Sequence, residues 1–366
     1  MKIEKFVPKH ILGITPYSLD ADFPKNLSKK YTRLSLNENL IVERDFILNL
    51  ISSSLNEIDP RLYPEPHGKI AVRAISKFLN IDESNIFIGN GLDDVLDRIS
   101  RVFITTEMKV AIIEPTFTIY SYYIELCNGI KVPIMLKDNF ELDVDRTLKV
   151  CENGVKLLFL CSPNSPTGNQ FDEKDVNEIL SKFNGITIID ETYSDFGRYS
   201  VCKWLDDFEN LIVLKSFSKA YGLAGVRIGY MLANKNIVDI MKKSVHPFNV
   251  NSISQRVVET VLEKYKYFKE NIDYLKTERE RLKKDLQGIS GVTVYPSDTN
   301  FILFRVDNRI TSLELQSKLK DMGMIIKDRG NLPLLENCLR MTIGTKAMNS
   351  NLINALKTIL EINGKI

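Results

Sequence analysis

The sequence predicts an α/β fold with a central, mostly parallel sheet, joined to a smaller α+β domain. Short apolar runs alternate with helix-length segments up to about residue 250, and this alternation is typical of parallel sheets covered by helices. The apolar runs are continuous rather than alternating, as expected for strands buried on both faces. The chain of 366 residues exceeds the size at which one hydrophobic core usually stops growing, so two domains are expected.

The chain is expected to begin with an arm, residues 1–40, that joins the small domain or a neighbouring subunit. This arm is rich in Pro, Asn and Lys and shows no helical pattern. The large domain is expected at 41–250. Its candidate strands are Ile86–Ile88, Val110–Ile113, Leu157–Cys161, Thr187–Ile189 and Leu211–Leu214, and its candidate helices are Asp93–Phe103, Thr118–Cys127 and Glu173–Phe183.

The small domain is expected at 251–366, where the pattern changes. It begins with a long charged segment, Ser254–Leu286. The expected strands are Gly291–Tyr295, Asn300–Arg305, Met324–Lys327 and Cys338–Ile343, with a helix at Ser312–Met322 and a closing helix at the end of the chain.

The composition excludes several classes of protein. With 49 basic and 47 acidic residues the formal net charge is +2, which argues against a general nucleic-acid or membrane-surface role. No apolar run approaches the roughly 20 residues of a membrane span, and MKIEKFVPKH lacks the apolar stretch of a signal peptide. The 5 cysteines show no CxxC spacing and the 3 histidines are scattered, so reduced core cysteines in a cytoplasmic protein are expected rather than disulfides or a metal site.

Four segments place polar or glycine residues where a candidate strand ends, which is where ligands bind in open α/β sheets. The first is FIGNGLDDVLDRI, in which a strand runs into Gly89, Asn90 and Gly91 before a helix opens with Asp93 and Asp94. Glycines let the backbone approach a ligand, and the free N–H groups at a helix start hold anions. An ordinary turn is the alternative interpretation.

The second segment is LLFLCSPNSPTGNQF, whose strand ends at Cys161. Pro163 and Pro166 restrict the backbone of the loop that follows. The loop is therefore expected to present the Asn164 side chain in one direction. A proline-stiffened turn with Asn as a turn former is the alternative.

The third segment is ITIIDETYSDF, where Asp190 directly follows three isoleucines and a threonine, and Tyr193 lies three positions later. A carboxylate at the end of a buried strand is costly to desolvate unless a cation meets it. The segment therefore indicates a cationic group near Asp190, unless this residue only caps the next helix or turn.

The fourth segment is LKSFSKAYGLAGVRIGY. Lys219 lies close to a strand end, where partial desolvation lowers the pKa of an amine and makes it a nucleophile toward carbonyls. Ser216, Ser218 and Arg227 suit a phosphate, since a hydroxyl donates once and a guanidinium can donate twice. Each of these residues taken alone would be an ordinary loop or surface residue.

Together the four segments suit a phosphorylated aldehyde that needs a lysine, an aspartate for a pyridinium nitrogen and a donor for a ring hydroxyl. That cofactor is pyridoxal 5′-phosphate, for which a lysine Schiff base and an acidic pyridinium partner are the expected signature. With SPNSPTG, DETY and SFSKAYGLAGVRIGY in this order, the chain resembles the fold-type-I pyridoxal-phosphate aminotransferases over nearly its whole length. The resemblance implies their fold, with a seven-stranded, mostly parallel sheet in the large domain and a smaller α+β domain.

The resemblance also implies catalytic roles. Lys219 is expected to bind the cofactor aldehyde and then to move the proton between substrate Cα and cofactor C4′. Asp190 is expected to pair with the pyridinium N–H, and Asn164 and Tyr193 to donate to the phenolate oxygen O3′.

The remaining matched residues are expected to bind the rest of the cofactor and the substrate. Phe117, in EPTFTIY, is expected to stack on the cofactor ring, and Arg340, in CLRMTIGT, to receive the substrate α-carboxylate. Leu92 is expected to contribute only its backbone N–H, and not its side chain, to phosphate binding. The implied phosphate ligands are the Gly91–Leu92–Asp93 turn, Ser216, Ser218 and Arg227.

Three further features resemble the histidinol-phosphate aminotransferase branch, namely ITPYS, LSLNENL and LYPEPHGKIAVRAISKFL. They imply that Tyr17 closes over the substrate and that Asn39 lies near the site entrance. They also imply a homodimer in which Tyr63 reaches the cofactor phosphate of the partner subunit.

The chain departs from this branch at two positions. Leu40 stands where the branch usually has proline after NEN, and Lys327, in IIKDRG, stands where it has an arginine that helps grip the substrate phosphate. Lysine keeps the charge but lacks the bidentate fork of arginine. Arg329, two positions later, is the candidate to compensate.

The expected activity is therefore the pyridoxal-phosphate-dependent transamination of histidinol phosphate with 2-oxoglutarate, a step of histidine biosynthesis. Histidinol phosphate has a phosphate arm and no α-carboxylate, so Arg340 and a second cation would serve glutamate and the phosphate in turn. The alternatives are an aminotransferase for aromatic or other amino acids coupled to glutamate, and a threonine-phosphate decarboxylase of the same fold. A regulator with a degenerate aminotransferase domain is disfavoured, because the lysine and arginine are present and no DNA-binding appendage is seen.

Overall fold

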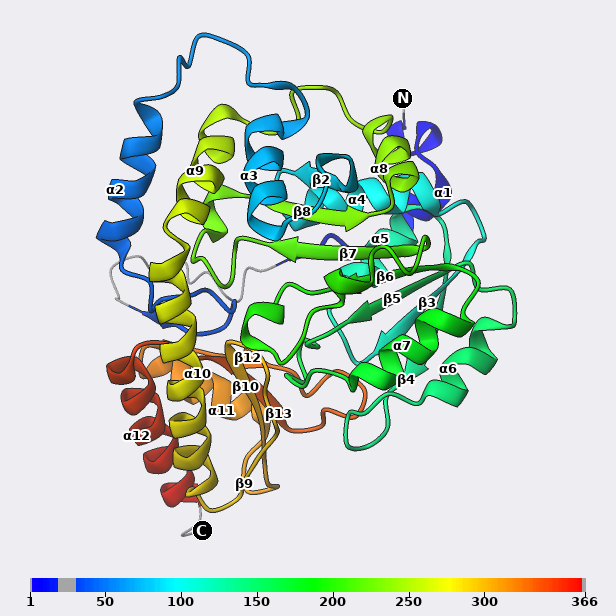
Figure 1. The fold of residues 1–366 in the computed structure, drawn as a ribbon. Helices are drawn as coiled ribbons and strands as arrows, with labels where there is room; N and C mark the ends of the chain where they lie inside the picture. The colour runs from blue at the N-terminus through cyan, green and yellow to red at the C-terminus, as the bar shows by residue number, and fades with distance from the viewer. Residues whose placement is uncertain (1, 19–30, 364–366) are drawn as a thin grey trace.

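The computed structural model describes residues 2–18 and 31–363, and a seven-stranded sheet forms the centre of its larger part (Figure 1). The strand order is β2-β8-β7-β6-β5-β3-β4, and β8 alone runs antiparallel to its neighbours. The predicted fold class is confirmed. The strands are β2 Ile86–Gly89, β3 Lys109–Glu114, β4 Ile130–Met135, β5 Leu157–Cys161, β6 Ile186–Asp190, β7 Leu211–Ser216 and β8 Gly229–Ala233.

Helices cover both faces of this sheet because successive side chains of each buried strand point to opposite sides. In β3, Val110 and Ile112 belong to one apolar cluster, with side chains of α4, α5 and α8, whereas Ala111 and Ile113 belong to the other, with side chains of α2, α3, α7 and α9. The helices are α2 Arg44–Leu55, α3 Lys69–Leu79, α4 Leu92–Phe103, α5 Ile119–Leu126, α6 Val144–Cys151, α7 Glu173–Lys182, α8 Lys235–Lys242 and α9 Ser252–Glu263.

Two strands of the sheet were not among the predicted ones. Strand β4 is an edge strand whose sequence IKVPIM includes Lys131 and Pro133, so it shows no continuous apolar run. Strand β8 begins at Gly229, inside the segment that the sequence marks as a ligand site. Its apolar residues therefore read as the end of that motif rather than as a strand.

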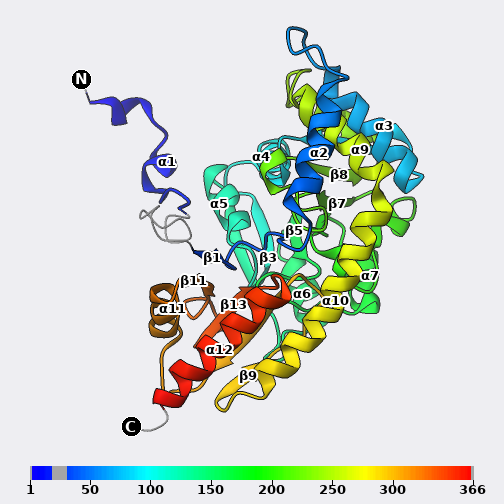
Figure 2. The ribbon, with the colours of Figure 1, turned by 90° about the vertical axis from the view of Figure 1, so that its left-hand side faces the viewer.

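The second part of the chain, here called the small domain, contains a four-stranded antiparallel sheet of order β12-β13-β10-β9. Helix α10 leads into it from the large domain, and α12 runs beside α10 in both views (Figures 1 and 2). Its elements are α10 Tyr265–Gln287, β9 Val292–Val294, β10 Phe301–Val306, α11 Ser312–Asp321, β11 Met324–Ile325, β12 Lys327–Asp328, β13 Cys338–Thr342 and α12 Lys346–Asn363.

One expectation for this region needs correction, and one segment to which the sequence assigned no element proves to be helical. The charged segment Ser254–Leu286 is two helices, α9 and α10, that meet at Lys264. The expected strand Met324–Lys327 is also divided. Its first half, β11, pairs with β1, and Lys327 begins β12, which pairs with β13.

The N-terminal segment contains short helices, contrary to the prediction that it has none. A 3₁₀ helix spans Ile3–Phe6 and α1 spans Lys9–Gly13. These elements are too short to show a helical period in the sequence. Figure 2 shows α1 on the side of α5, away from the main body.

The end of the arm is fixed to the small domain. Strand β1, Thr32–Arg33, pairs in parallel with β11. Residues 1 and 19–30 of the expected arm lie outside the described residues. The boundaries at 40 and 250 remain predictions. Within the described residues, no helix combines the length and the apolar character needed to cross a membrane.

Candidate active site

A cavity of about 530 Å³ lies where the carboxyl ends of β5, β6 and β7 meet the arm and the small domain. We call it the central cavity. Most of the residues singled out in the sequence line it, although they come from all three parts of the chain. They are Tyr17, Leu92, Asp93, Phe117, Asp190, Tyr193, Ser216, Ser218, Lys219, Arg227, Lys327, Arg329 and Arg340.

Asp190 ends β6 with its side chain buried beside the cavity. Side chains alternate along the strand, so Ile188 and Asp190 point to the face that α5 covers. There Tyr120 Oη donates to Asp190 Oδ2 at 2.6 Å, and the Thr192 N–H donates to Oδ1 at 2.9 Å. Burial raises the pKa of the Asp190 carboxyl against these two hydrogen bonds. A cation facing the carboxylate from the cavity would lower it again.

An ion pair that the sequence did not reveal lies at the ends of β6 and β7, on the face of the sheet opposite to Asp190. Lys215 Nζ lies 2.9 Å from Glu191 Oε2 and donates to Ser194 Oγ at 2.8 Å. Burial lowers the pKa of the Lys215 amine, but Glu191, Cys202, Tyr230 and Asp195 together outweigh it and leave that pKa well above its usual value. The pair links the carboxyl ends of β6 and β7, which are also paired through their backbones.

Lys219 follows β7 and points toward the arm. Its Nζ donates to the backbone oxygen of Leu36 at 2.8 Å. Burial, together with the charge of Arg340, lowers the pKa of Lys219 to about 8. The lowered pKa increases the neutral fraction of this amine near neutral pH, and the neutral amine is the form that attacks a carbonyl.

An anion-binding set lies at the start of α4. Gly91 has φ +85°, and a Cβ there would lie 2.3 Å from Arg227 Nη2, so only glycine lets the guanidinium lie against this turn. Arg227 Nη2 also lies 3.1 Å from Asp93 Oδ2. The Ser218 N–H donates to Ser216 Oγ at 3.1 Å. Two hydroxyls, a guanidinium and the N–H groups of a helix start suit a phosphate.

Asn164 is not among the described residues that line the central cavity, and its contact with the cofactor ring oxygen stays a prediction. Its Nδ2 donates to Pro115 O at 2.9 Å and to Thr167 Oγ1 at 2.8 Å, so both amide N–H groups are used. Its Oδ1 accepts from Thr116 Oγ1 at 2.7 Å. The side chain therefore anchors the loop after β5 to the end of β3.

The opposite wall of the cavity is cationic. Arg340 on β13 donates through Nη1 to Ser165 Oγ at 3.0 Å and through Nη2 to Ser35 O at 2.6 Å. Lys327 is the cross-strand neighbour of Arg340 on β12, and Arg329 lines the same cavity. The arginine thus joins the large domain, the arm and the small domain beside the candidate nucleophile.

Tyr193 accepts a hydrogen bond from Asn37, a cavity residue that the sequence analysis did not select. Asn37 Nδ2 lies 2.8 Å from Tyr193 Oη. Asn39, which was selected, does not line the cavity. Its Nδ2 donates to Ala220 O at 3.0 Å, and its Oδ1 accepts from the Ile41 N–H.

Two aromatic residues of the prediction frame the cavity, and a third lies outside it. Tyr17 Oη is 3.4 Å from Thr118 Oγ1. Phe117 lies edge-on to Tyr120, at 5.7 Å between ring centroids. Tyr63 is 81% exposed and stacks on Phe248 at 4.6 Å. It does not reach the cavity of its own chain.

Three cavity residues were missed for identifiable reasons. Tyr120 lies near the start of α5, three positions after Phe117, and its ring contacts that of Phe117. Ser165 is the polar neighbour of Asn164 between the same two prolines. Asn37 precedes Asn39 by two, and only contacts with the small domain decide which of them faces inward.

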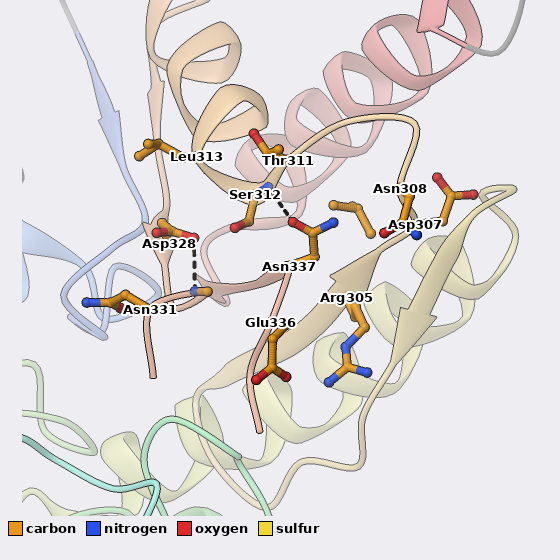
Figure 3. A pocket seen from close by; sticks show the side chains of 12 residues that line it. Arg305, Asp307, Asn308, Thr311, Ser312, Leu313, Asp328, Asn331, Glu336 and Asn337 are labelled. Carbon is orange, nitrogen blue, oxygen red and sulfur yellow. Dashed lines mark hydrogen bonds between the residues drawn. The ribbon is translucent and has the colours of Figure 1, made fainter. Parts of the chain in front are cut away.

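A second pocket, of about 690 Å³, lies in the small domain (Figure 3). Its lining includes three carboxylates, those of Asp307, Asp328 and Glu336. Arg305 is the only cationic residue among the described lining residues. Figure 3 shows the hydrogen bond from the Ser312 N–H to Asn337 Oδ1 at its edge. An excess of carboxylates does not suit a phosphate or an amino-acid carboxylate. The central cavity is therefore the candidate active site.

The central cavity fits pyridoxal 5′-phosphate on three observations of its own. The buried Asp190 carboxylate accepts hydrogen bonds from neutral groups and has room for a cationic ring nitrogen on the cavity side. Lys219 is a lysine with a lowered pKa. The turn at Gly91, with φ +85°, lies against the Arg227 guanidinium and presents an anion-binding set.

Comparison with known proteins identifies the family of the chain. Residues 31–356 match the family model of class I and II aminotransferases. A histidinol-phosphate aminotransferase of Caldanaerobacter subterraneus subsp. tengcongensis is 34% identical over 360 residues, which cover 98% of this chain and 100% of that protein.

Two solved structures share the fold. The histidinol-phosphate aminotransferase of Sinorhizobium meliloti in complex with pyridoxal-5′-phosphate has a TM-score of 0.89 at 23% identity, over 97% of each chain. The L-threonine-O-3-phosphate decarboxylase of Porphyromonas gingivalis has a TM-score of 0.77 at 26% identity, over 90% of this chain and 99% of that one.

The fold and the lysine-centred cavity define a pyridoxal-phosphate-dependent enzyme that transfers amino groups. The chain belongs to the class I and II aminotransferase family. The predictions of an aminotransferase and of pyridoxal 5′-phosphate as its cofactor are confirmed.

Proposed function

We propose that the enzyme transfers the amino group of histidinol phosphate to 2-oxoglutarate, as a step of histidine biosynthesis. The observation that carries this proposal is the cationic wall of Arg340, Lys327 and Arg329 in the same cavity as Lys219. Glutamate presents a carboxylate to this wall in one half-reaction, and histidinol phosphate presents a phosphate in the other. The name of the relative that is 34% identical over its full length supports the same substrate.

Each residue of the cavity has a separate role in binding the cofactor or in moving the proton. When bound, pyridoxal 5′-phosphate supplies an aldehyde carbon that exchanges amino groups and a ring that withdraws electrons from substrate Cα. Lys219 Nζ holds the cofactor and moves the Cα proton. Asp190 stabilises a cationic ring nitrogen, with Tyr120 orienting its carboxylate. Tyr193 donates to the ring oxygen, and Phe117 covers one face of the ring.

The two ends of the cavity bind the two anions. Gly91, the N–H of Leu92, Ser216, Ser218 and Arg227 hold the cofactor phosphate at the start of α4, where Asp93 pairs with the arginine. At the other end Arg340 and Lys327 hold the anionic arm of the substrate, and Tyr17 closes over it. Charge at both ends and a nucleophile between them orient the substrate relative to Lys219.

We also propose a cytoplasmic homodimer. The odd number of cysteines, 5, and the absence of CxxC spacing in the sequence favour a reducing compartment. The exposed Tyr63 ring, next to the apolar Leu62 and Phe248, is suited to contact with a second copy. In that dimer Tyr63 would donate to the cofactor phosphate of the partner subunit.

The substrate is tested by half-reactions without any oxo acid. The cofactor-loaded enzyme is incubated separately with histidinol phosphate, phenylalanine and threonine phosphate, and conversion to the amino form of the cofactor is followed by absorbance. Histidinol phosphate is expected to convert the cofactor fastest, with no CO₂ released from any substrate. The Lys219→Ala variant is the control that shows conversion to be enzymatic. Conversion by phenylalanine alone would identify an aromatic aminotransferase, and CO₂ from threonine phosphate would identify a decarboxylase.

The action of Tyr63 in trans is tested by mixing subunits. Tyr63→Phe is expected to weaken cofactor binding by about tenfold, because one hydrogen bond to a charged group is lost. A heterodimer of Tyr63→Phe and Lys219→Ala chains then contains one site with native lysine and native tyrosine. That site should bind the cofactor with native affinity. If heterodimers form and show no tight site, Tyr63 acts within its own chain.

A further inference from the structure

Asn37 lies at a junction of the arm, the large domain and the small domain. It is 1% exposed, and its backbone is left-handed, with φ 55°. Its N–H donates to Thr342 Oγ1 at 2.9 Å, and its carbonyl accepts from Asn300 Nδ2 at 2.9 Å. Both partners belong to the small domain, which therefore fixes the backbone of Asn37 beside the central cavity.

The same contacts determine which way the Asn37 amide points. Thr342 Oγ1 accepts the Asn37 N–H, and its own proton points toward Asn37 Oδ1 at 3.4 Å. The oxygen of the amide is thus turned to Thr342, and the nitrogen to Tyr193. Asn37 Nδ2 donates to Tyr193 Oη at 2.8 Å.

This arrangement leaves the Tyr193 hydroxyl proton for the cavity. A tyrosine hydroxyl has one proton and can accept at the same time. Since the Tyr193 oxygen accepts from Asn37, its proton is not needed there. The ring itself is held edge-on by Phe301, at 5.2 Å between centroids and 84° between planes. The Tyr193 hydroxyl proton can still rotate about the C–O bond. The hydrogen bond from Asn37 Nδ2 keeps this proton from pointing toward Asn37.

We propose that Asn37 is a positioning residue that turns the Tyr193 proton toward the ring oxygen of bound pyridoxal 5′-phosphate. The proposal rests on the proposed function only for the role of Tyr193. It explains why an asparagine with a strained backbone occupies this buried position, since the left-handed conformation is one that asparagine tolerates better than most residues. The contacts of Asn37 with Thr342 and Asn300 in the small domain would then be needed for the hydrogen bond from Tyr193 to the ring oxygen.

The test is a pH titration of the visible absorption of the bound cofactor, without substrate. A donor to the ring oxygen favours its charged form, so losing the donor raises the midpoint of the titration. Tyr193→Phe is expected to raise it by about one pH unit, which is a tenfold change in the proton equilibrium. Asn37→Asp should do the same, because a carboxylate accepts the Tyr193 proton and draws it away from the cavity. The other ionisable groups near Tyr193, namely Arg340, Cys161 and Asp190, are kept in every variant.

The double variant separates this effect from the added charge. If Asn37→Asp acts through the Tyr193 proton, adding it to Tyr193→Phe produces no further shift. A shift that adds in full would overturn the proposal, because the carboxylate would then act by its charge alone. A native midpoint in Asn37→Asp would overturn it as well.

Asn37→Gly covers the case in which the aspartate variant fails to fold. Glycine keeps the left-handed backbone and removes the amide. The midpoint should lie between those of the native enzyme and Tyr193→Phe, and an unchanged midpoint would contradict the role of Asn37. Because no substrate is used, these results do not depend on whether histidinol phosphate is the amino donor.

Discussion

Replacing Asp190 by asparagine is expected to lower kcat by a factor of about 10²–10⁴ while the protein keeps its fold. Leaving one member of a buried charge pair without its partner costs about 3–5 kcal/mol, and each 1.36 kcal/mol is tenfold in rate. Here the partner is the cationic ring nitrogen, which an amide cannot stabilise. The side chains are nearly equal in size, and the site is buried between Tyr120 and Thr192, so the structure should be preserved.

The control for this experiment is Tyr120→Phe. It removes the hydrogen bond to Asp190 Oδ2 and leaves the carboxylate charge in place. The expected loss in kcat is about tenfold, in line with one hydrogen bond to a charged group. Thermal denaturation of both variants verifies the fold. A folded Asp190→Asn enzyme with native kcat would show that Asp190 does not face a cation.

The strand ends of this site were predictable because their chemistry is local. Asp190 ends a strand that is mostly isoleucine, and Lys219 follows a second apolar strand. Strand alternation then assigns each neighbour to a face. Asp190 and Ser216 turn to the cavity, and Glu191 and Lys215 turn to the opposite side. A buried lysine that neutralises a buried glutamate does not differ in sequence from a solvated pair, so this ion pair was not foreseen.

Positions decided by distant contacts were not predictable. The prolines mark the loop after β5, but the hydrogen bonds from Asn164 to Pro115 and Thr167 decide that Ser165 faces inward. Asn37 is selected over Asn39 by Thr342, which is 305 residues away in the chain. Such choices depend on packing between domains, and no local pattern encodes them.

Arg340→Ala is expected to reduce kcat/KM by a hundredfold or more for glutamate and for histidinol phosphate alike. Removing one partner of a desolvated, charge-assisted contact costs about 2–5 kcal/mol, and the loss appears in kcat/KM because both substrates use the same cation. The change also removes the contacts to Ser165 and Ser35 that join the domains. Arg340→Lys is therefore the matched variant. It keeps the charge without the bidentate fork and should recover part of the activity.

Lys327→Ala is expected to behave differently from Arg340→Ala, and the difference tests the assignment of the substrate. A phosphomonoester carries close to two negative charges at neutral pH, whereas a carboxylate carries one. Lys327, the cross-strand neighbour of Arg340, supplies the second positive charge. Its removal should lower kcat/KM by about tenfold or more for histidinol phosphate and by less than about threefold for glutamate. Lys327→Arg, which restores the charge, should return the ratio of the two values to that of the native enzyme. Equal losses for the two substrates would mean that Lys327 does not bind the phosphate, and that the cationic wall recognises a carboxylate in both half-reactions.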